Sequence, residues 1–171
     1  NSTQGDKIVE FALRSDSLII LEIALAKGLA LEATVAGNTL LATAIQNSST
    51  KIAEALINKG ADVQVMIDNN SPLVHMAVHN KMNAVVAELL DLGADINTQT
   101  VNLQNTALHE AIEVNNISMA KILIQDGANI KVKNALGQTV SKMAKALKRK
   151  EIKKMILKEK IKRFLTRITK R

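Results

Sequence analysis

The strongest constraint on the fold is a sequence repeat with a period near 33 residues. Four copies end in related motifs: Gly28-Leu29-Ala30-Leu31, Gly60-Ala61-Asp62-Val63, Gly93-Ala94-Asp95-Ile96 and Gly127-Ala128-Asn129-Ile130. An alanine lies sixteen residues before each of these glycines, and a fifth alanine continues the series: Ala12, Ala44, Ala77, Ala111 and Ala144. Repeats of this length bury apolar surface only against neighbouring copies. The period therefore predicts a stack of similar structural units.

The copy at 105–130 shows what each unit contains. Its apolar residues fall into two short runs separated by Asn115 and Asn116, and Gly127 ends the second run. The first run contains Ala107, Leu108, Ala111 and Ile112, and the second contains Ile117, Ala120, Ile122, Leu123 and Ile124. This spacing predicts two short antiparallel helices, each with one apolar side.

A second motif precedes the first helix in four of the five copies. The most complete copy of this motif is Thr106-Ala107-Leu108-His109-Glu110-Ala111. Less complete copies are Thr39-Leu40-Leu41-Ala42-Thr43-Ala44 and Pro72-Leu73-Val74-His75-Met76-Ala77, and in the second of these the Ser71-Pro72 pair stands one residue early. Thr139 and Ala144 remain in the last copy. With the period and the Gly-Ala-Asp/Asn endings, these T-x-L-H-x-A motifs resemble the ankyrin-repeat family over residues 5–160.

The resemblance implies an all-α repeat solenoid, in which helix–turn–helix units stack and β-hairpin loops, or fingers, protrude. We expect repeats at about 5–36, 37–69, 70–103, 104–136 and 137–160, then a basic amphipathic capping helix at 161–171. The cap either extends the preceding helix or follows a brief turn. The helix expected at 18–26 is apolar around most of its circumference, so either further chain packs on it or the end of the stack is apolar.

The composition argues against an enzyme. The chain has no cysteine, so it has neither a disulfide nor a thiolate ligand or nucleophile. It has no Gly-x-Ser-x-Gly turn, and its seven glycines are spread along the repeats rather than gathered in a phosphate-binding loop. No apolar run approaches the roughly 18 residues of a membrane span. We expect no catalytic activity, no cofactor, no metal, and an intracellular location.

The histidines have a structural interpretation. His75 and His79 are four residues apart and could begin a zinc site, but no third ligand has a matching spacing. The resemblance implies instead that His75 and His109 hydrogen-bond the backbone between repeats. The motif glycines Gly60, Gly93 and Gly127 are likewise expected to be structural.

The candidate binding surface lies in the fingers. Several loop positions are apolar: Val35, Met66, Ile67, Val101, Leu103 and Leu136. Either these side chains form a row that binds a partner, or they fold back between the fingers. The resemblance implies that the fingers and the adjoining first helices form a concave partner-binding surface. Its expected residues are Val35, Asn38, Gln46, Asn47, Met66, Asp68, Asn69, His79, Asn80, Val101, Asn102, Leu103, Asn105, Glu113, Val114, Leu136 and Gln138.

Charge is divided unevenly along the chain. Residues 142–171 hold 14 Lys/Arg and two Asp/Glu, a net charge of +12, whereas residues 1–141 hold nine Lys/Arg and 14 Asp/Glu, a net charge of −5. The basic tail, with Lys158, Lys162, Arg163 and Arg167, has three interpretations. It is the solvated face of a cap, a site for acidic protein, anionic lipid or nucleic acid, or a nuclear-import or secretion signal.

Two of these partners are less favoured. Phe164 is the only aromatic residue near the tail lysines, so nucleic acid lacks a stacking platform. A membrane surface is a lesser alternative, because the apolar residues it would need are equally needed to seal the last repeat: Leu157, Ile161, Leu165 and Ile168.

The sequence therefore predicts a monomeric, non-catalytic scaffold that binds a protein partner. Abundant lysine, isoleucine and asparagine with few aromatics would suit an effector of an intracellular bacterium, located in the cytoplasm or delivered into a host cell. The alternative is an electrostatic adaptor whose basic C-terminal helix docks on anionic lipid, nucleic acid or an acidic protein. Steep weakening with rising salt would distinguish that adaptor.

Overall fold

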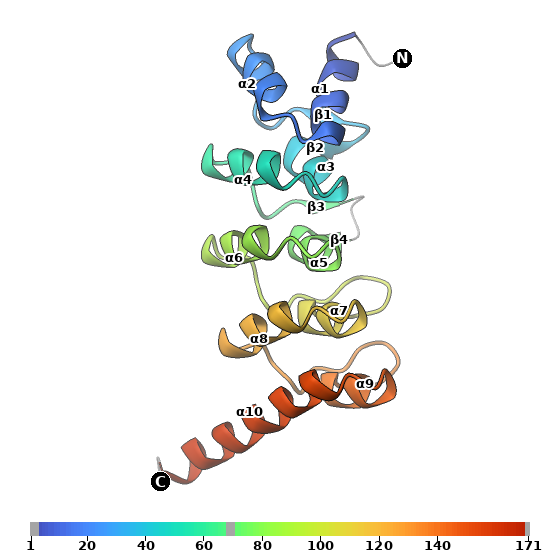
Figure 1. Cartoon of the computed structure of the whole chain (residues 1–171), viewed down its shortest axis with the longest axis vertical. Helices are drawn as coiled ribbons and strands as arrows, with labels where there is room; N and C mark the ends of the chain where they lie inside the picture. Colours follow the sequence, from blue (N-terminus) through green and yellow to red (C-terminus); the bar gives the residue numbers. More distant parts are fainter. Residues whose placement is uncertain (1–3, 68–70, 170–171) are drawn as a thin grey trace. The chain divides into compact units, whose positions relative to one another are not determined.

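The computed structural model of the chain describes residues 4–67 and 71–169. It divides into two compact units, Asn1–Asp95 and Ile96–Arg171. Each unit is a stack of helical pairs (Figure 1). None of the helices in these described ranges is both long and apolar enough to cross a membrane.

The first unit contains three helical pairs and two hairpins. The pairs are α1 (Gln4–Ser15) with α2 (Leu18–Ala26), α3 (Leu40–Gln46) with α4 (Thr50–Asn58), and α5 (Leu73–His79) with α6 (Asn83–Asp91). First helices pack on first helices and second on second, so the pairs form layers. The hairpins join β1 (Thr34–Val35) to β2 (Asn38–Thr39) and β3 (Met66–Ile67) to β4 (Ser71–Pro72).

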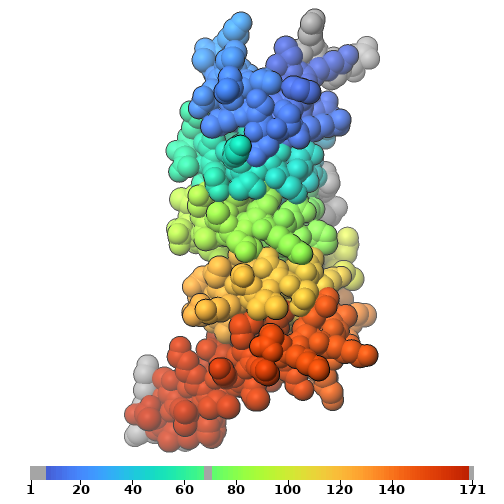
Figure 2. Space-filling view, viewed as in Figure 1, coloured from blue at the N-terminus to red at the C-terminus, as the bar shows by residue number. Residues whose placement is uncertain are grey.

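The second unit contains two helical pairs. They are α7 (Ala107–Glu113) with α8 (Ile117–Gln125), and α9 (Val140–Ala146) with α10 (Lys150–Thr169). Here α7 packs on α9 and α8 packs on α10. The predicted fingers are present, but the strand pairing in each is a single antiparallel bridge. One bridge joins Gln99 to Thr106 and the other joins Lys133 to Thr139. Within each unit the layers follow one another in chain order as bands of surface (Figure 2).

The repeated alanines occupy the centre of each layer. All five are at most 1% exposed: Ala12, Ala44, Ala77, Ala111 and Ala144. A methyl group at this position lets helices approach closely. Around it, aliphatic side chains fill the interior, among them Leu41, Ile52, Leu108 and Leu123. The 33-residue period of the sequence is therefore the period of the core.

Helix ends follow the repeat motifs. Gly127 has a φ of 93°, its amide donates to Ile124 O, and the Ala128 amide donates to Leu123 O at 2.9 Å. This Schellman arrangement satisfies carbonyls at the end of α8, and Gly60 and Gly93 make the same pair of bonds. Thr39 and Thr139 cap α3 and α9 through their hydroxyls. These observations support the structural role expected of the three glycines.

The early position of the Ser71-Pro72 pair does not change where its helix begins. Pro72 stands at the N-cap of α5, where Thr106 stands at the N-cap of α7, so α5 starts in register with the other first helices. The early Ser71-Pro72 pair instead forms β4. Pro72 has neither a hydroxyl nor an amide hydrogen, so this copy cannot form the cap that threonine provides.

The C-terminal helix corrects one interpretation. α10 runs without a break from Lys150 to Thr169, so the tail extends the last repeat helix. Its buried residues are Ile152 and Ile156, at 0% and 1% exposure. The residues expected to seal the last repeat are more than half exposed instead: Leu157, Ile161, Leu165 and Ile168. That expectation is wrong, because those side chains lie on another side of the helix.

The opposite end of the chain is also apolar. In α1 and α2, four large apolar side chains are at least half exposed: Ile8, Phe11, Ile19 and Ile23. The apolar circumference predicted for the helix at 18–26 is therefore exposed in part on α2.

Candidate partner-binding surface

Two fingers of the second unit are hydrogen-bonded to each other. We call residues 98–105 and 132–138 the finger platform. The Ala135 amide donates to Leu103 O at 2.9 Å, and Gln99 Nε2 donates to Lys133 O at 3.0 Å. Because bonds link the fingers at two points, their apolar side chains are held in a fixed relative position. Such preorganisation lowers the entropy cost of binding a partner.

Asn134 shapes the second finger. Its Oδ1 accepts hydrogen bonds from the Leu136 amide at 3.1 Å and the Gln138 amide at 3.0 Å. Its Nδ2 donates to Asn105 Oδ1 at 3.1 Å. Sequence reasoning missed this residue, although an asparagine three residues before Gly137 is a recognised turn signal. Asn134 therefore sets the conformation in which Leu136 is presented.

Asn105 is buried inside the platform and does not form part of its exposed surface. Its side chain is 2% exposed, and its Nδ2 donates to Glu110 Oε1 at 3.0 Å. With its other bond to Asn134, it connects the two fingers to α7. The expectation that Asn105 lies on the binding surface is therefore corrected.

His109 connects the platform to the next layer. It is completely buried, its Nε2 donates to Gln138 O at 3.1 Å, and its Nδ1 accepts from the Thr106 amide at 3.2 Å. Thr106 and His109 thus form a reciprocal cap at the start of α7. Burial lowers the pKa of His109, and the bond to the Gln138 carbonyl opposes this shift. The predicted backbone bond between repeats is confirmed for this histidine.

The platform exposes three apolar side chains. Leu136 is 73% exposed, Val101 62% and Leu103 52%, and Asn102 beside them is also exposed. At the end of α7, Glu113 is exposed and Val114 is half-buried. These three apolar finger residues are therefore exposed and do not fold back between the fingers.

In the first unit, two of the apolar finger residues are buried instead. Val35 and Ile67 are 9% and 2% exposed, so they fold into the unit, and Asn38 is buried at 8%. These positions cannot contact a partner through their side chains, which corrects the expected surface for Val35 and Asn38. Met66 is 45% exposed and remains a candidate. Asp68 and Asn69 lie outside the described residues.

The adjoining first-helix ends have partly structural roles. Gln46 is half-buried, Asn47 and His79 are exposed, and Asn80 donates through Nδ2 to Ile45 O at 2.7 Å. Carbonyls at a helix end need such partners. In the second unit, Arg149 does the same, donating to Ile112 O at 3.2 Å and Glu113 O at 2.9 Å. Nothing in the basic run distinguished Arg149 from its neighbours.

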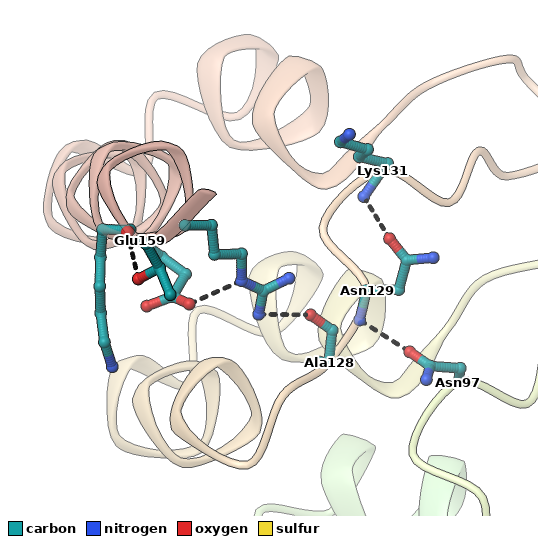
Figure 3. Close-up of polar contacts among 8 residues, drawn as sticks. Asn97, Ala128, Asn129, Lys131 and Glu159 are labelled. Atoms are coloured by element: carbon teal, nitrogen blue, oxygen red, sulfur yellow. Dashed lines mark hydrogen bonds and ion pairs between the residues drawn. The ribbon is translucent and has the colours of Figure 1, made fainter. Parts of the chain in front are cut away.

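The basic tail separates into free and engaged cations. Arg163 is half-buried; it bonds Glu159 Oε1 at 2.6 Å and Ala128 O at 3.2 Å (Figure 3). It therefore clamps α10 to the chain after α8 and is structural. Lys158, Lys162 and Arg167 are exposed. The same view shows the Asn129 amide donating to Asn97 Oδ1 at 2.7 Å, which ties the turn after α8 to residue 97 of the same unit.

The structure also places the two histidines that could begin a zinc site. Within the described ranges, no three or more histidine, cysteine, aspartate or glutamate side chains gather where they could hold a metal ion. His75 is buried in α5, whereas His79 at the end of α5 is exposed. The two histidines spaced for a zinc site therefore lie in different environments.

Comparison with known proteins agrees with this architecture. The family model described as "Ankyrin repeats (3 copies)" matches residues 10–100 and 67–134. The chain belongs to the ankyrin-repeat family. Ankyrin repeats generally mediate protein–protein interaction, and the family is typically a non-catalytic interaction module.

The relatives come from varied sources. BRCA1-associated RING domain protein 1 of Caenorhabditis elegans is 33% identical over 110 residues, covering 64% of this chain and 16% of that protein. A putative ankyrin repeat protein of Rickettsia bellii is 31% identical over 143 residues, covering 68% and 21%. Human ankyrin repeat and SOCS box protein 6 is 29% identical over 109 residues, covering 60% and 26%. The chain therefore spans about a quarter or less of these relatives.

Proposed function

We propose that this chain is a non-catalytic scaffold that binds a protein partner through the finger platform. The observation that carries the proposal is the exposure of Val101, Leu103 and Leu136 on two fingers that are hydrogen-bonded to each other. Buried apolar anchors supply most of the energy at protein interfaces, and a rigid presentation makes their burial more favourable.

The surrounding groups fit such an interface. Asn102, which lies between Val101 and Leu103 in the chain, is exposed, and Glu113 is exposed at the end of α7. Exposed polar groups of this kind form the rim of typical interfaces. In the first unit, Met66, Asn47 and His79 provide a smaller set of exposed positions. We place the main anchor on the second unit because it exposes three large apolar finger residues.

The test is capture of partners by a charged variant and a matched control. Leu103→Asp with Leu136→Asp is expected to lower partner affinity about 100-fold, since losing an anchor typically costs a factor of about ten or more. Leu92→Asp is the control, because Leu92 is 53% exposed, close to the 52% of Leu103, but lies outside the platform. The measurement is affinity capture from cell extract, then titration of the captured protein.

Each outcome decides the proposal. Loss of the same captured protein with the platform variant, and its retention with Leu92→Asp, supports the platform. Equal retention with both variants, when both keep the helical circular dichroism of the parent, contradicts it.

We further propose that the protein acts inside the host cell of an intracellular bacterium. The composition rich in lysine, isoleucine and asparagine and the likeness to the Rickettsia bellii protein support this. We expect an antibody against the chain to detect it in the host-cell fraction of an infected culture. Detection within the bacteria alone would contradict delivery.

The second candidate function is the electrostatic adaptor. It is favoured by the exposure of Lys158, Lys162 and Arg167 on α10. Arg163 does not belong to its binding set, since Glu159 and Ala128 engage it.

A further inference from the structure

α10 carries two apolar stripes on opposite sides. One stripe, Ile152 and Ile156, is buried in the second unit. The other is 52–63% exposed and contains Leu157, Ile161, Phe164, Leu165 and Ile168. At 3.6 residues per turn, the exposed stripe covers an arc of about 100°, the width typical of an apolar helix face. We call it the outer stripe.

Basic residues border the outer stripe on both edges. Lys153, Lys160 and Arg167 are spaced seven apart along one edge, and Lys158 and Lys162 lie along the other. The two acidic residues of α10 are already paired: Glu151 with Lys154 at 3.1 Å and Glu159 with Arg163 at 2.6 Å. The positive charge beside the outer stripe is therefore uncompensated within the helix.

A groove adjoins the helix on the same unit. It has a volume of about 760 Å³ and lies between residues 129–131 and 160–167. Four cationic residues line it together with the clamp residue Arg163: Lys131, Lys160, Lys162 and Arg167. Anionic groups would be attracted to this concavity, because one sign of charge lines it.

We propose that α10 binds the surface of a membrane containing anionic lipids, an inference that rests on the electrostatic-adaptor function and names its partner. The outer stripe enters the boundary between headgroups and acyl chains, and the two basic edges contact the headgroups. Binding does not require α10 to leave the body, because Ile156 and the Arg163 clamp hold its other side. The helix therefore lies on the membrane while still part of the repeat unit.

Other occupants fit the observations less well. Nucleic acid would match the charge but offers no apolar layer for the outer stripe. A second copy of the chain packed stripe against stripe would cover the apolar side chains but would bring the same uncompensated positive charge alongside them. An anionic lipid surface supplies both negative charge and an apolar layer. Among these occupants, charge complementarity together with the apolar stripe favours the membrane surface.

The experiment is co-sedimentation of the full chain with vesicles. Vesicles of phosphatidylcholine with about a third phosphatidylserine are expected to bind the chain, and pure phosphatidylcholine is not, since each Lys/Arg contributes about fivefold at an anionic surface. Raising the salt concentration should weaken binding by screening. Sedimentation velocity without lipid reports whether the chain self-associates.

Phe164→Ser tests the outer stripe against a matched control. Phe164 is 63% exposed and Phe11 is 62% exposed, and they are the two phenylalanines of the chain. Phe164→Ser is expected to weaken vesicle binding about tenfold, since insertion of the ring is lost. Phe11→Ser should leave binding within about twofold, because it lies outside the basic helix.

A charge variant completes the set. Lys160→Gln with Arg167→Gln is expected to weaken binding about 25-fold, and the control Lys51→Gln with Lys59→Gln less than about twofold. Equal binding to both vesicle types, or equal loss from Phe164→Ser and Phe11→Ser, overturns the proposal. A dimer that Phe164→Ser converts to monomer, without vesicle binding by the parent, overturns it in favour of a second copy.

Discussion

Ile156→Ala is expected to lower the free energy of unfolding by about 2–5 kcal/mol. Ile156 is 1% exposed on the side of α10 that packs in the second unit. Truncation removes apolar contacts and leaves a cavity that neighbouring side chains fill only in part. Urea unfolding, followed by circular dichroism of the full chain, measures the change. It should appear as a lower midpoint with little change in slope.

The adjacent residue provides the control. Leu157→Ala should change the free energy of unfolding by less than about 0.5 kcal/mol, because substitutions at exposed surface positions usually have small effects. Leu157 is 57% exposed and belongs to the outer stripe. Similar losses for the two variants would mean that α10 is rotated about its axis relative to this structure. Leu157 would then be packed rather than exposed, which would contradict the membrane proposal.

His109→Ala is expected to lower the free energy of unfolding by about 2–4 kcal/mol. The imidazole is completely buried, and its removal leaves the Gln138 carbonyl and the Thr106 amide without the bonds they make to it. Each unsatisfied buried group costs about 1–3 kcal/mol, and the cavity adds to this. Urea unfolding again measures the loss, with His79→Ala as an exposed control expected to change stability by less than about 0.5 kcal/mol.

The same histidine makes stability depend on pH. The ordinary pKa of 6.5 is lowered for His109 in the folded chain, chiefly by burial. Above that value both states hold a neutral imidazole, so the stabilisation is complete. As the pH falls below 6.5 the unfolded chain binds a proton more readily than the folded chain, so stability decreases. Unfolding between pH 8 and 5.5 should show this decrease in the parent and a smaller one in His109→Ala.

Glu88 makes the opposite contribution. Burial, and secondly the negative charge of Glu54, raise the pKa of its carboxyl from 4.5. The folded chain therefore binds that proton more readily, and stability increases as the pH falls. Because Glu88 titrates identically in the parent and in His109→Ala, the difference between them isolates His109. An identical pH dependence in both would contradict the assignment.

Much of the fold could be predicted because the repeat imposes the same physics in every copy. The alanines mark where helices approach closely, and the glycines mark where a positive φ ends the second helix. These requirements are local, so residue type and spacing reveal them. Even α2 has the predicted bounds, Leu18–Ala26.

The candidate surface was less predictable. Val35 and Leu103 are both apolar residues in fingers, yet one is 9% exposed and the other 52%. Which of them faces solvent depends on the path of the finger and on its bonds to the next one. Asn105 and Asn134 also look like ordinary polar loop residues, but they bond to each other and are buried inside the platform. Sequence spacing does not encode such partners.

The sequence by itself determined the family, the period and the length of the units, since these follow from local patterns that recur five times. Only the tertiary structure decided which finger residues are exposed. It also decided which side of α10 packs: the spacing from Leu157 to Ile168 marks an apolar stripe but not what covers it. In the structure Ile152 and Ile156 take the packed side, and Arg163 clamps the helix there. Burial depends on neighbours distant in sequence, so a helix with two apolar stripes could be oriented only by its contacts.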